Sequence, residues 1–275
     1  IEFYYNLIIN MNKRIIISDI LLKKGKSKIV AMTCYTAQFS NLFDKYTDLL
    51  LVGDSLGMVV YGLENTLNVT VRMMVDHGKA VVNTTKNSLI VVDLPFGSYE
   101  NSKEKAFVTA AKIISKTGAS AIKIEGGSEF SETVKFLVDR GIPVMGHIGL
   151  LPQRVKTVGK FSVAGKSSMD EKRILKDAKC LEKAGAFAIV VEAVKESLGK
   201  RITKSISIPT VGIGAGRFCD GQILVADDML GLFNNFTPKF VKKYANLNKE
   251  IDKAVKKYSE DVTLGKFPDK DTIYK

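Results

Sequence analysis

The chain has 275 residues, 45% of them hydrophobic, and a formal net charge of +12. This length and apolar content suffice for one large domain with a substantial core. No apolar run reaches the roughly 20 residues that a membrane-spanning helix needs. The lysines are spread over nearly every polar stretch instead of clustering beside aromatic residues. The composition therefore argues against a membrane protein and against specific nucleic-acid binding.

The first ten residues, "IEFYYNLIIN", are apolar but lack the basic leading segment and the small-residue cleavage site of a signal peptide. Met11 follows them, so residues 1–10 are interpreted as a non-native or disordered extension, and 11–275 as a single catalytic domain. The cysteines Cys34, Cys180 and Cys219 are far apart and odd in number. This pattern predicts neither a disulfide framework nor a zinc site, and it favours a reducing cytoplasm.

Eight short apolar runs, rich in Val, Ile and Leu, follow one another along the chain. They are typical of buried parallel strands. The runs are "KIVAMT" (28–33), "LLLVGD" (49–54), "LIVVD" (89–93), "AIKIE" (121–125), "IPVMGH" (142–147), "FAIVVE" (187–192), "IPTVGIG" (208–214) and "ILVADD" (223–228).

Longer segments with helical spacing separate most of these runs. The clearest covers 101–120, where Asn101 or Ser102 can cap a helix that Gly118 ends. A similar segment covers 170–186, with Gly185 as its stop. A short helix at 18–24 is expected to precede the first strand and to close the lower end of the fold, and a long helix is expected after Thr237.

Eight strands that alternate with helices over about 250 residues predict an α/β fold, the (β/α)8 TIM barrel. A doubly wound open sheet is the competing fold, and it would also place a ligand site at the carboxyl ends of its strands. The barrel is favoured because there are eight candidate strands and no break suggests two halves.

Acidic residues end four of the predicted strands. Asp54, Asp93, Glu125 and Glu192 follow strands two, three, four and six, and His147 follows strand five. Any one of these acids could be an ordinary polar residue at a strand end. Since the carboxyl ends of barrel strands meet at one mouth, all five side chains are expected to converge where barrel enzymes hold their catalytic residues.

Clustered carboxylates repel one another, and oxygen ligands select a hard cation such as Mg²⁺. We expect Asp54 and Asp93 to be direct Mg²⁺ ligands, and Glu125 to bind the ion directly or through water. Glu192 lies farther round the mouth and is free to act as a base. Lys123 alternates with Glu125 on one strand, so it also points into the barrel and could hold an oxyanion.

Three other signals are weaker. "GIGAG" (212–216) could offer amides to an anion, but it lacks a complete dinucleotide-binding pattern, and tight turns would also explain it. Cys219 has no neighbour in sequence that would activate it as a nucleophile. His77 lies in a predicted helix and is interpreted as structural or merely polar.

At the strand ends the sequence resembles the ketopantoate hydroxymethyltransferase (3-methyl-2-oxobutanoate hydroxymethyltransferase) family of pantothenate biosynthesis. The resemblance spans 11 to about 268. The matching stretches are "VGDSLGM" (52–58), "DLPFGSY" (93–99), "KIEGG" (123–127), "GHIGLLPQ" (146–153), "VVEAV" (190–194), "VGIGAG" (211–216), "DGQILV" (220–225) and "PKF" (238–240).

This resemblance implies an Mg²⁺-dependent barrel that moves a hydroxymethyl group from 5,10-methylenetetrahydrofolate to 3-methyl-2-oxobutanoate, through an Mg²⁺-stabilised enolate, to give 2-dehydropantoate. It also implies a homo-oligomer, with a decamer as the expected size. The implied roles are metal binding by Asp54, Asp93 and Glu125, substrate binding by Asp54, Ser55, Asp93, Lys123 and His147, and proton abstraction by Glu192.

Two stretches depart from the family pattern. Residues 159–165 read "GKFSVAG" where "GGYKVQG" is expected, and 65–70 read "NTLNVT" where "STLPVT" is expected. Neither change replaces an acid. Both lie in loops where lid movement or folate contacts would be affected.

Two other functions stay open at this point. A related Mg²⁺-dependent lyase or mutase of the isocitrate lyase and phosphoenolpyruvate mutase kind also uses 2-oxo acids, but its "KKCGH"-type loop does not occur here. A basic RNA-binding protein is supported by the net charge alone. Binding that disappears between low and physiological salt would show such attraction to be non-specific.

Overall fold

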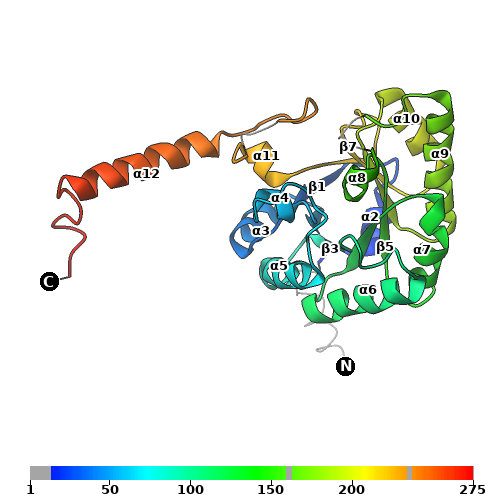
Figure 1. Ribbon diagram of the computed structural model, residues 1–275, viewed down its shortest axis with the longest axis horizontal. Coiled ribbons are helices and arrows are strands. Elements are labelled where there is room, and N and C mark those ends of the chain that lie inside the picture. The colour runs from blue at the N-terminus through cyan, green and yellow to red at the C-terminus, as the bar shows by residue number, and fades with distance from the viewer. Residues whose placement is uncertain (1–13, 159–162, 234–236, 275) are drawn as a thin grey trace, which may run out of the picture. The chain divides into compact units, whose positions relative to one another are not determined.

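The computed structural model describes residues 14–158, 163–233 and 237–274 (Figure 1). The expectation for residues 1–10 and part of the altered stretch 159–165 therefore lie outside the described residues. Eight parallel strands form a closed barrel in the order β1 to β8, and β8 pairs with β1. The predicted TIM barrel is confirmed. The strands are β1 Ile29–Thr33, β2 Leu49–Val52, β3 Leu89–Asp93, β4 Ala121–Glu125, β5 Val144–Gly149, β6 Ala188–Glu192, β7 Thr210–Ile213 and β8 Gly221–Leu224.

Two apolar clusters stabilise the barrel. Alternate residues of each strand point inward and form one cluster, which includes Leu49, Leu51, Leu89 and Val91. The residues between them, such as Leu50, point outward and pack against the helices in a larger second cluster. Strands buried on both faces need apolar side chains in both directions, which explains why they appear in the sequence as continuous apolar runs.

The amino end of the barrel is closed by α2 (Ile17–Leu22), close to the helix expected at 18–24. Ile20 of this helix is fully buried and belongs to the cluster inside the barrel, with Ile15 and Ile17 packed against it. The interior is therefore filled at this end.

Helices surround the barrel (Figure 1). The predicted caps of the clearest one, α6 (Lys103–Thr117), are confirmed, because Ser102 accepts a hydrogen bond from the amide of Lys105 and Gly118 adopts a φ of 77°. The remaining described helices of this unit are α3 Ala37–Phe43, α4 Leu56–Val59, α5 Val71–Thr84, η1 Ser128–Phe130, α7 Ser131–Val138, η2 Pro152–Arg154, α8 Val155–Val158, α9 Ser168–Lys183 and α10 Glu196–Ser205.

The eighth strand is shifted from its prediction. It was expected at 223–228, whereas β8 begins at Gly221 and ends at Leu224. Residues Ala226–Leu230 form the helix α11 instead, with Asp227 and Asp228 in its first turn. Burial raises the pKa of both carboxyls, and the charge of Asp227 adds to the rise of the Asp228 pKa to about 6.

The chain divides into two compact units, with the boundary between Val225 and Ala226. The second unit contains α11 and the long helix α12 (Leu247–Thr263), which was expected after Thr237. The expectation of one domain over 11–275 stays a prediction. Among the described residues, every helix is too short or too polar to span a bilayer.

Candidate active site

The acidic residues predicted to converge do lie at the carboxyl ends of neighbouring strands. Asp93 and Glu125 are the last residues of β3 and β4, Glu192 is the last of β6, and Asp54 follows β2 by two residues. Strand register pairs Asp93 with Lys123. It also pairs Glu125 with His147, and Glu192 with Gly149. The closed sheet thereby places these side chains side by side.

Asp54, Asp93 and Lys123 form the first part of the site. The backbone amide of Asp54 donates to Asp93 Oδ2 at 3.0 Å. Lys123 Nζ lies 3.0 Å from the other carboxylate oxygen, Asp93 Oδ1. A Cβ at Gly53 would lie 2.8 Å from Ser55 Oγ, so glycine permits the tight turn that brings Asp54 beside Asp93. All three charged side chains are at most 4% exposed.

The two aspartates have more negative charge around them than their surroundings neutralise. Burial and the charges of Asp93 and Glu125 hold the pKa of Asp54 well above its usual range. Burial also raises the pKa of Asp93, although Lys123 opposes this effect. Asp93 Oδ1 is buried and accepts no hydrogen bond of good geometry from the described residues. A bound cation would relieve this excess charge, so the residues present fit a hard divalent ion.

The number of direct protein ligands is limited. Among the described residues, no group of three His, Cys, Asp or Glu side chains is placed to hold a metal ion unaided. Glu125 already has neighbours, because Oε2 accepts from the amide of Gln153 at 3.0 Å and Oε1 lies 3.5 Å from His147. Two aspartates completed by water is the arrangement that Mg²⁺ commonly adopts.

His147 lies between Lys123 and Glu192. Its Nδ1 lies 3.2 Å from Lys123 Nζ. Its Nε2 lies 3.1 Å from Glu192 Oε2, a distance typical of an ion pair, but the N–H direction is poor for a hydrogen bond. Burial and Lys123 lower the pKa of His147, but Glu125 and Glu192 outweigh them and raise it to about 9. The contact with Lys123 is a hydrogen bond only where Nδ1 accepts, whereas a protonated Nδ1 faces Glu125 instead, so the charges around His147 set which of the two groups it pairs with.

The pKa values of Glu125 and Lys123, which both lie beside His147, also depend on the neighbouring charges. Burial alone would raise the pKa of Glu125, yet contact with His147 and Lys123 holds it below its usual range. Burial alone would lower the pKa of Lys123, yet Asp93, Glu125 and Asp54 raise it. The ammonium of Lys123 and the imidazole of His147 thus alternate with carboxylates across the mouth, and this arrangement can hold an anionic substrate.

Gln153 and Tyr99 belong to the site but were missed as functional residues, although both lie in the quoted motifs. Gln153 Nε2 donates to Asp54 Oδ2 at 2.8 Å and to the Leu94 carbonyl at 3.0 Å. Tyr99 OH lies 2.6 Å from Gln153 Oε1 and 3.1 Å from the Glu125 carbonyl, and its single proton is donated to the nearer acceptor, Gln153. Gln153 therefore orients Asp54, while its backbone amide orients Glu125.

Three other residues singled out in the sequence, Ser55, His77 and Cys219, have surroundings that the structure defines. Ser55 Oγ lies 2.8 Å from Tyr35 OH, next to Asp54. His77 on α5 contacts the carbonyl of Tyr35 through Nδ1 at 2.6 Å and Tyr61 OH through Nε2 at 3.1 Å, as expected of a structural histidine. Cys219 is buried, and burial raises the pKa of its thiol, which disfavours the nucleophilic thiolate.

Comparison with known families explains this arrangement. The model of the family described as ketopantoate hydroxymethyltransferase matches residues 14–270. The chain belongs to this family. The ketopantoate hydroxymethyltransferase family relatives include a 3-methyl-2-oxobutanoate hydroxymethyltransferase of Brucella canis, 50% identical over 262 residues and 95% of each chain. Another, from Bordetella petrii, is 54% identical over 245 residues and 89% of each chain.

Solved structures show that the fold of this ketopantoate hydroxymethyltransferase family member is shared more widely. A phosphonopyruvate hydrolase in complex with oxalate and Mg²⁺ aligns with a TM-score of 0.59 and 13% identity, over 89% of this chain and 87% of the other. A 2,3-dimethylmalate lyase of the phosphoenolpyruvate mutase/isocitrate lyase superfamily aligns with a TM-score of 0.57 and 12% identity, over 94% and 91%. At these identities the likeness concerns the barrel alone.

Proposed function

We propose that this protein transfers a hydroxymethyl group from 5,10-methylenetetrahydrofolate to 3-methyl-2-oxobutanoate and so forms 2-dehydropantoate for pantothenate biosynthesis. The observation that carries the proposal is the cluster of Asp54, Asp93, Glu125, His147 and Glu192 at one mouth, in a chain that belongs to the ketopantoate hydroxymethyltransferase family. A 2-oxo acid has a carboxylate and a keto oxygen, and both suit a site that combines a cation with the buried ammonium of Lys123 and the buried imidazole of His147.

Asp54 and Asp93 would hold Mg²⁺, with Glu125 contributing through water. When bound, Mg²⁺ supplies Lewis-acid stabilisation of the negative charge that develops on the keto oxygen. Lys123, 3.0 Å from Asp93, adds a fixed positive charge on the same side. The raised pKa values of both aspartates support this assignment, because a cation would favour their ionised forms.

Glu192 would act as the base. Its side chain is 15% exposed, so it can reach a substrate in the mouth, and His147 Nε2 lies 3.1 Å from its carboxylate. Glu192 takes the proton from C3, and C3 then forms a carbon–carbon bond with the one-carbon unit of the donor. Both carbon–nitrogen bonds of the bridging methylene break in the overall reaction: water supplies the hydroxyl oxygen, and one proton of water and the proton taken from C3 end on the two nitrogens of tetrahydrofolate.

The test is a product assay with purified protein, MgCl₂, 3-methyl-2-oxobutanoate and 5,10-methylenetetrahydrofolate, with 2-dehydropantoate measured by mass spectrometry. The expected result is product that requires both the metal and the donor. In a parallel reaction without donor, C3 should exchange its proton with deuterium oxide while no product forms. Absence of both product and exchange would refute the proposal.

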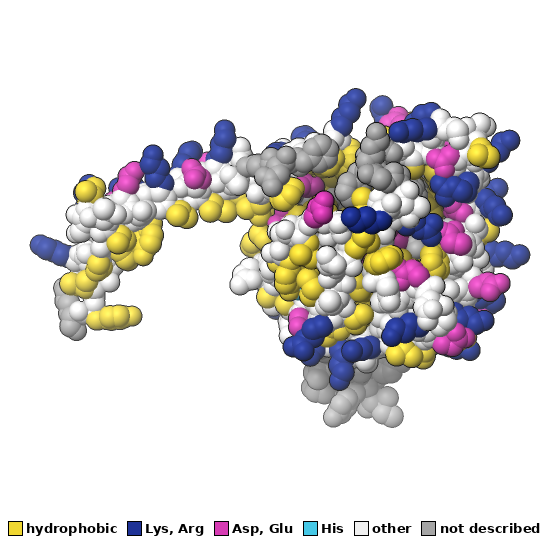
Figure 2. All heavy atoms as spheres, viewed as in Figure 1, with side chains coloured by type: hydrophobic (Ala, Val, Ile, Leu, Met, Phe, Trp, Pro, Cys, Tyr) yellow, Lys and Arg dark blue, Asp and Glu magenta, His cyan; other side chains and the backbone are white. Residues whose placement is uncertain are grey.

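We also propose that the protein is a cytoplasmic homo-oligomer that acts on small molecules, with a decamer as the expected size. α12 exposes Ile251, Val255, Tyr258 and Val262, which recur at the spacing of one helix face. Figure 2 shows apolar side chains gathered along one side of this helix. All three cysteines are free, which supports a reducing compartment. Light scattering measures the oligomer size, and a monomer at micromolar concentration would contradict assembly.

Nucleic acid is not among the proposed partners. Figure 2 shows the Lys and Arg side chains spread over the visible face of the barrel unit and interspersed with acids. Such a surface fits a solvated basic protein better than a nucleic-acid-binding patch.

A further inference from the structure

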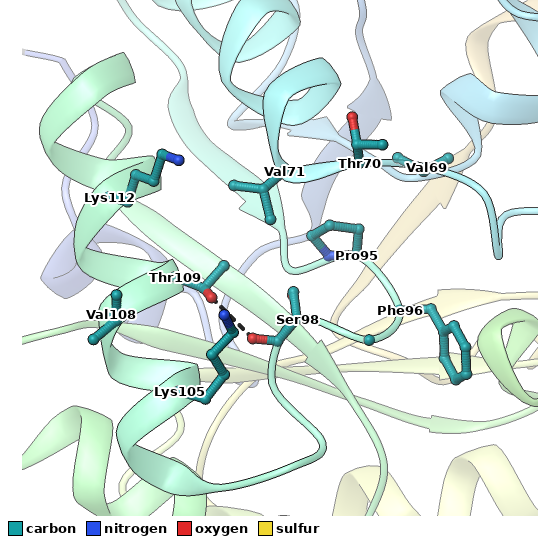
Figure 3. A pocket seen from close by; sticks show the side chains of 11 residues that line it. Val69, Thr70, Val71, Pro95, Phe96, Ser98, Lys105, Val108, Thr109 and Lys112 are labelled. Atoms are coloured by element: carbon teal, nitrogen blue, oxygen red, sulfur yellow. Dashed lines mark hydrogen bonds between the residues drawn. The ribbon is translucent and has the colours of Figure 1, made fainter.

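A cavity of about 360 Å³ is lined by residues that follow β2 and β3 along the chain (Figure 3). Its walls are the start of α5 at Val71, the loop that follows β3 at Pro95, Phe96 and Ser98, and one face of α6. The mechanism proposed above uses none of these side chains. Val69 and Thr70, from the stretch that departs from the family pattern, also line this cavity.

The cavity is close to the reacting groups along the chain. Asp93 ends β3, and Pro95 follows it by two residues, so their Cα atoms are at most about 7 Å apart. The loop is also fixed, because Thr109 Oγ1 on α6 donates to the carbonyl of Ser98 at 2.9 Å. The cavity is therefore preformed on the face of the barrel where substrates enter.

One wall of the cavity is cationic. Lys105 and Lys112 lie seven residues apart on α6, which places them about 10 Å apart on one face of the helix. In Figure 3 both ammonium groups lie on the side of α6 that faces Val71 and Pro95. Neither lysine side chain forms an ion pair with any acid in the part of the chain that the structure describes. Both charges are thus available to an anionic ligand.

The remaining lining suits an aromatic group followed by polar atoms. Phe96 is 46% exposed and Val108 is 61% exposed, so apolar surface borders the opening. Ser98 is only 5% exposed, and its hydroxyl has no hydrogen-bond partner among the described residues. A buried hydroxyl without a partner is unfavourable, and a ligand atom that pairs with it would gain binding energy.

We propose that this cavity binds the p-aminobenzoyl-glutamate tail of the one-carbon donor, with carboxylates of the glutamyl chain paired to Lys105 and Lys112. This inference rests on the proposed function, which requires a folate donor at the adjacent mouth. The aromatic ring contacts Phe96 and Pro95, and Ser98 hydrogen-bonds an amide of the tail. The separation of the two lysines fits a chain of more than one glutamate, because each ammonium group then pairs with a different residue.

The test measures binding without requiring turnover. p-Aminobenzoyl-triglutamate, which lacks the one-carbon unit, is titrated calorimetrically into the wild-type protein, the Lys105→Glu/Lys112→Glu variant and a control. The control, Lys79→Glu/Lys116→Glu, makes the same charge change on exposed residues of α5 and α6 that do not line the cavity. Loss of the two exposed ion pairs that Lys105 and Lys112 would form with the ligand should weaken its affinity by about tenfold.

We expect the pocket variant to bind the triglutamate about tenfold more weakly than the wild type, while the control changes by less than about threefold. Higher salt should reduce the difference. The Michaelis constant for a triglutamate donor should rise in parallel, with exchange at C3 of the 2-oxo acid unchanged. Should the charge reversal unfold the protein, Lys105→Gln/Lys112→Gln provides the same comparison.

The two proposals fail in different ways. Equal triglutamate affinity in the pocket variant and the control, with 2-dehydropantoate still formed, would overturn the cavity assignment and leave the function intact. Specific loss of triglutamate binding in a protein that forms no 2-dehydropantoate would support the cavity assignment and refute the function. Binding of monoglutamate and triglutamate with the same affinity would overturn the assignment of the lysines to the glutamyl chain.

Discussion

Both ends of the barrel bury aspartates, but the surroundings stabilise the ionised carboxylate at the amino end and destabilise it at the carboxyl end. At the amino end, Asp44 accepts hydrogen bonds from the backbone amides of Lys86, Asn87 and Ser88 at 2.7–3.0 Å. Burial would raise its pKa, yet these donors lower it. At the carboxyl end, Asp54 faces Asp93 and Glu125, and its pKa is raised well above the usual range.

Burial alone therefore does not distinguish a structural acid from a functional one. Asp44 and Asp54 are 6% and 4% exposed, but only the surroundings of Asp44 supply enough donors to make ionisation favourable. Asp220, also at the amino end, resembles Asp44, because Lys24 and the amide of Thr210 lower its pKa despite burial. The charge of Asp54 is left to be satisfied by a ligand. The variants below test this contrast in order of decreasing expected effect.

The largest effect is expected for Glu192→Gln, because it removes the proposed base from the carboxyl end without affecting the amino end. Exchange of the C3 proton of 3-methyl-2-oxobutanoate with deuterium oxide, followed by proton NMR, should slow by about 10²- to 10⁴-fold. Binding of Mg²⁺ and of the 2-oxo acid should persist. Rapid exchange would exclude Glu192 as the base, and loss of Mg²⁺ binding would move it into the metal shell.

The second prediction compares the same substitution at the two ends. Asp54→Asn should lower turnover by about 10³-fold, since Lewis-acid stabilisation is worth several kcal/mol. Its unfolding free energy in metal-free protein at pH 7 should equal or exceed that of the wild type, because a repulsive charge is removed. Asp44→Asn should instead keep the turnover number and lose about 2 kcal/mol of stability, because backbone donors lose their acceptor.

The contrast between Asp44 and Asp54 would fail if urea unfolding at pH 7 showed Asp54→Asn to be the less stable of the two variants.

The pH dependence of the unfolding free energy gives an independent check on Asp44 at the amino end. The folded-state pKa of Asp44 lies below its ordinary value of 3.8, so its contribution to stability is present above that pH. It is lost as the pH falls through the folded-state pKa.

The contribution of His147 to the free energy of unfolding should be lost as the pH rises, whereas that of Asp44 is lost as the pH falls. Its folded-state pKa of about 9 lies above the ordinary value of 6.5. The protonated form therefore stabilises metal-free protein fully below pH 6.5, and this contribution is lost as the pH rises through about 9. The difference corresponds to about 3 kcal/mol. The unfolding free energies of wild type and His147→Gln should converge over this range.

The chain offers a direct check because it contains only two histidines. In a His77→Gln variant, the remaining imidazole resonance belongs to His147 and should titrate near pH 9 in metal-free protein. A midpoint at or below 6.5 would show that Lys123 and burial dominate over the two glutamates.

The smallest effect is expected for Gln153→Met, which keeps the length of the side chain but removes its hydrogen bonds to Asp54 and Tyr99. Residues that orient metal ligands are commonly worth 10- to 100-fold, so turnover and Mg²⁺ affinity should both fall by about that factor. Gln222→Met, at an exposed position of β8, is the matched control. Full activity of Gln153→Met at limiting Mg²⁺ would remove Gln153 from the positioning role.

Much of the barrel could be predicted because its strands are buried on both faces and so appear as apolar runs. β3 and β4 were predicted to the residue at 89–93 and 121–125. The eighth strand was displaced because it begins with Gly221 and the exposed Gln222, which give no apolar signal. Its start is instead set by pairing of Gly221 with Ile29 across the barrel closure, a long-range contact that local sequence does not contain.

Convergence of the five site residues was predictable because strand ends of a barrel share one mouth. The supporting contacts were not. Gln153 follows β5 by four residues and reaches Asp54 only because η2 turns the loop back over the mouth. The pairing of His147 with Glu192 depends on the register of β5 and β6. These contacts come from geometry between segments, which the spacing of residues within one segment does not reveal.

The closure of the amino end by α2 has a consequence for the order of events in the reaction. Because Ile20 and the inward-facing strand residues fill the barrel, ligands enter and leave through the carboxyl-end mouth. In the proposed reaction the 2-oxo acid would react at the floor of that mouth, and the larger folate would cover it. Kinetics should therefore be ordered, with the acid binding before the donor and tetrahydrofolate leaving before the hydroxymethylated acid.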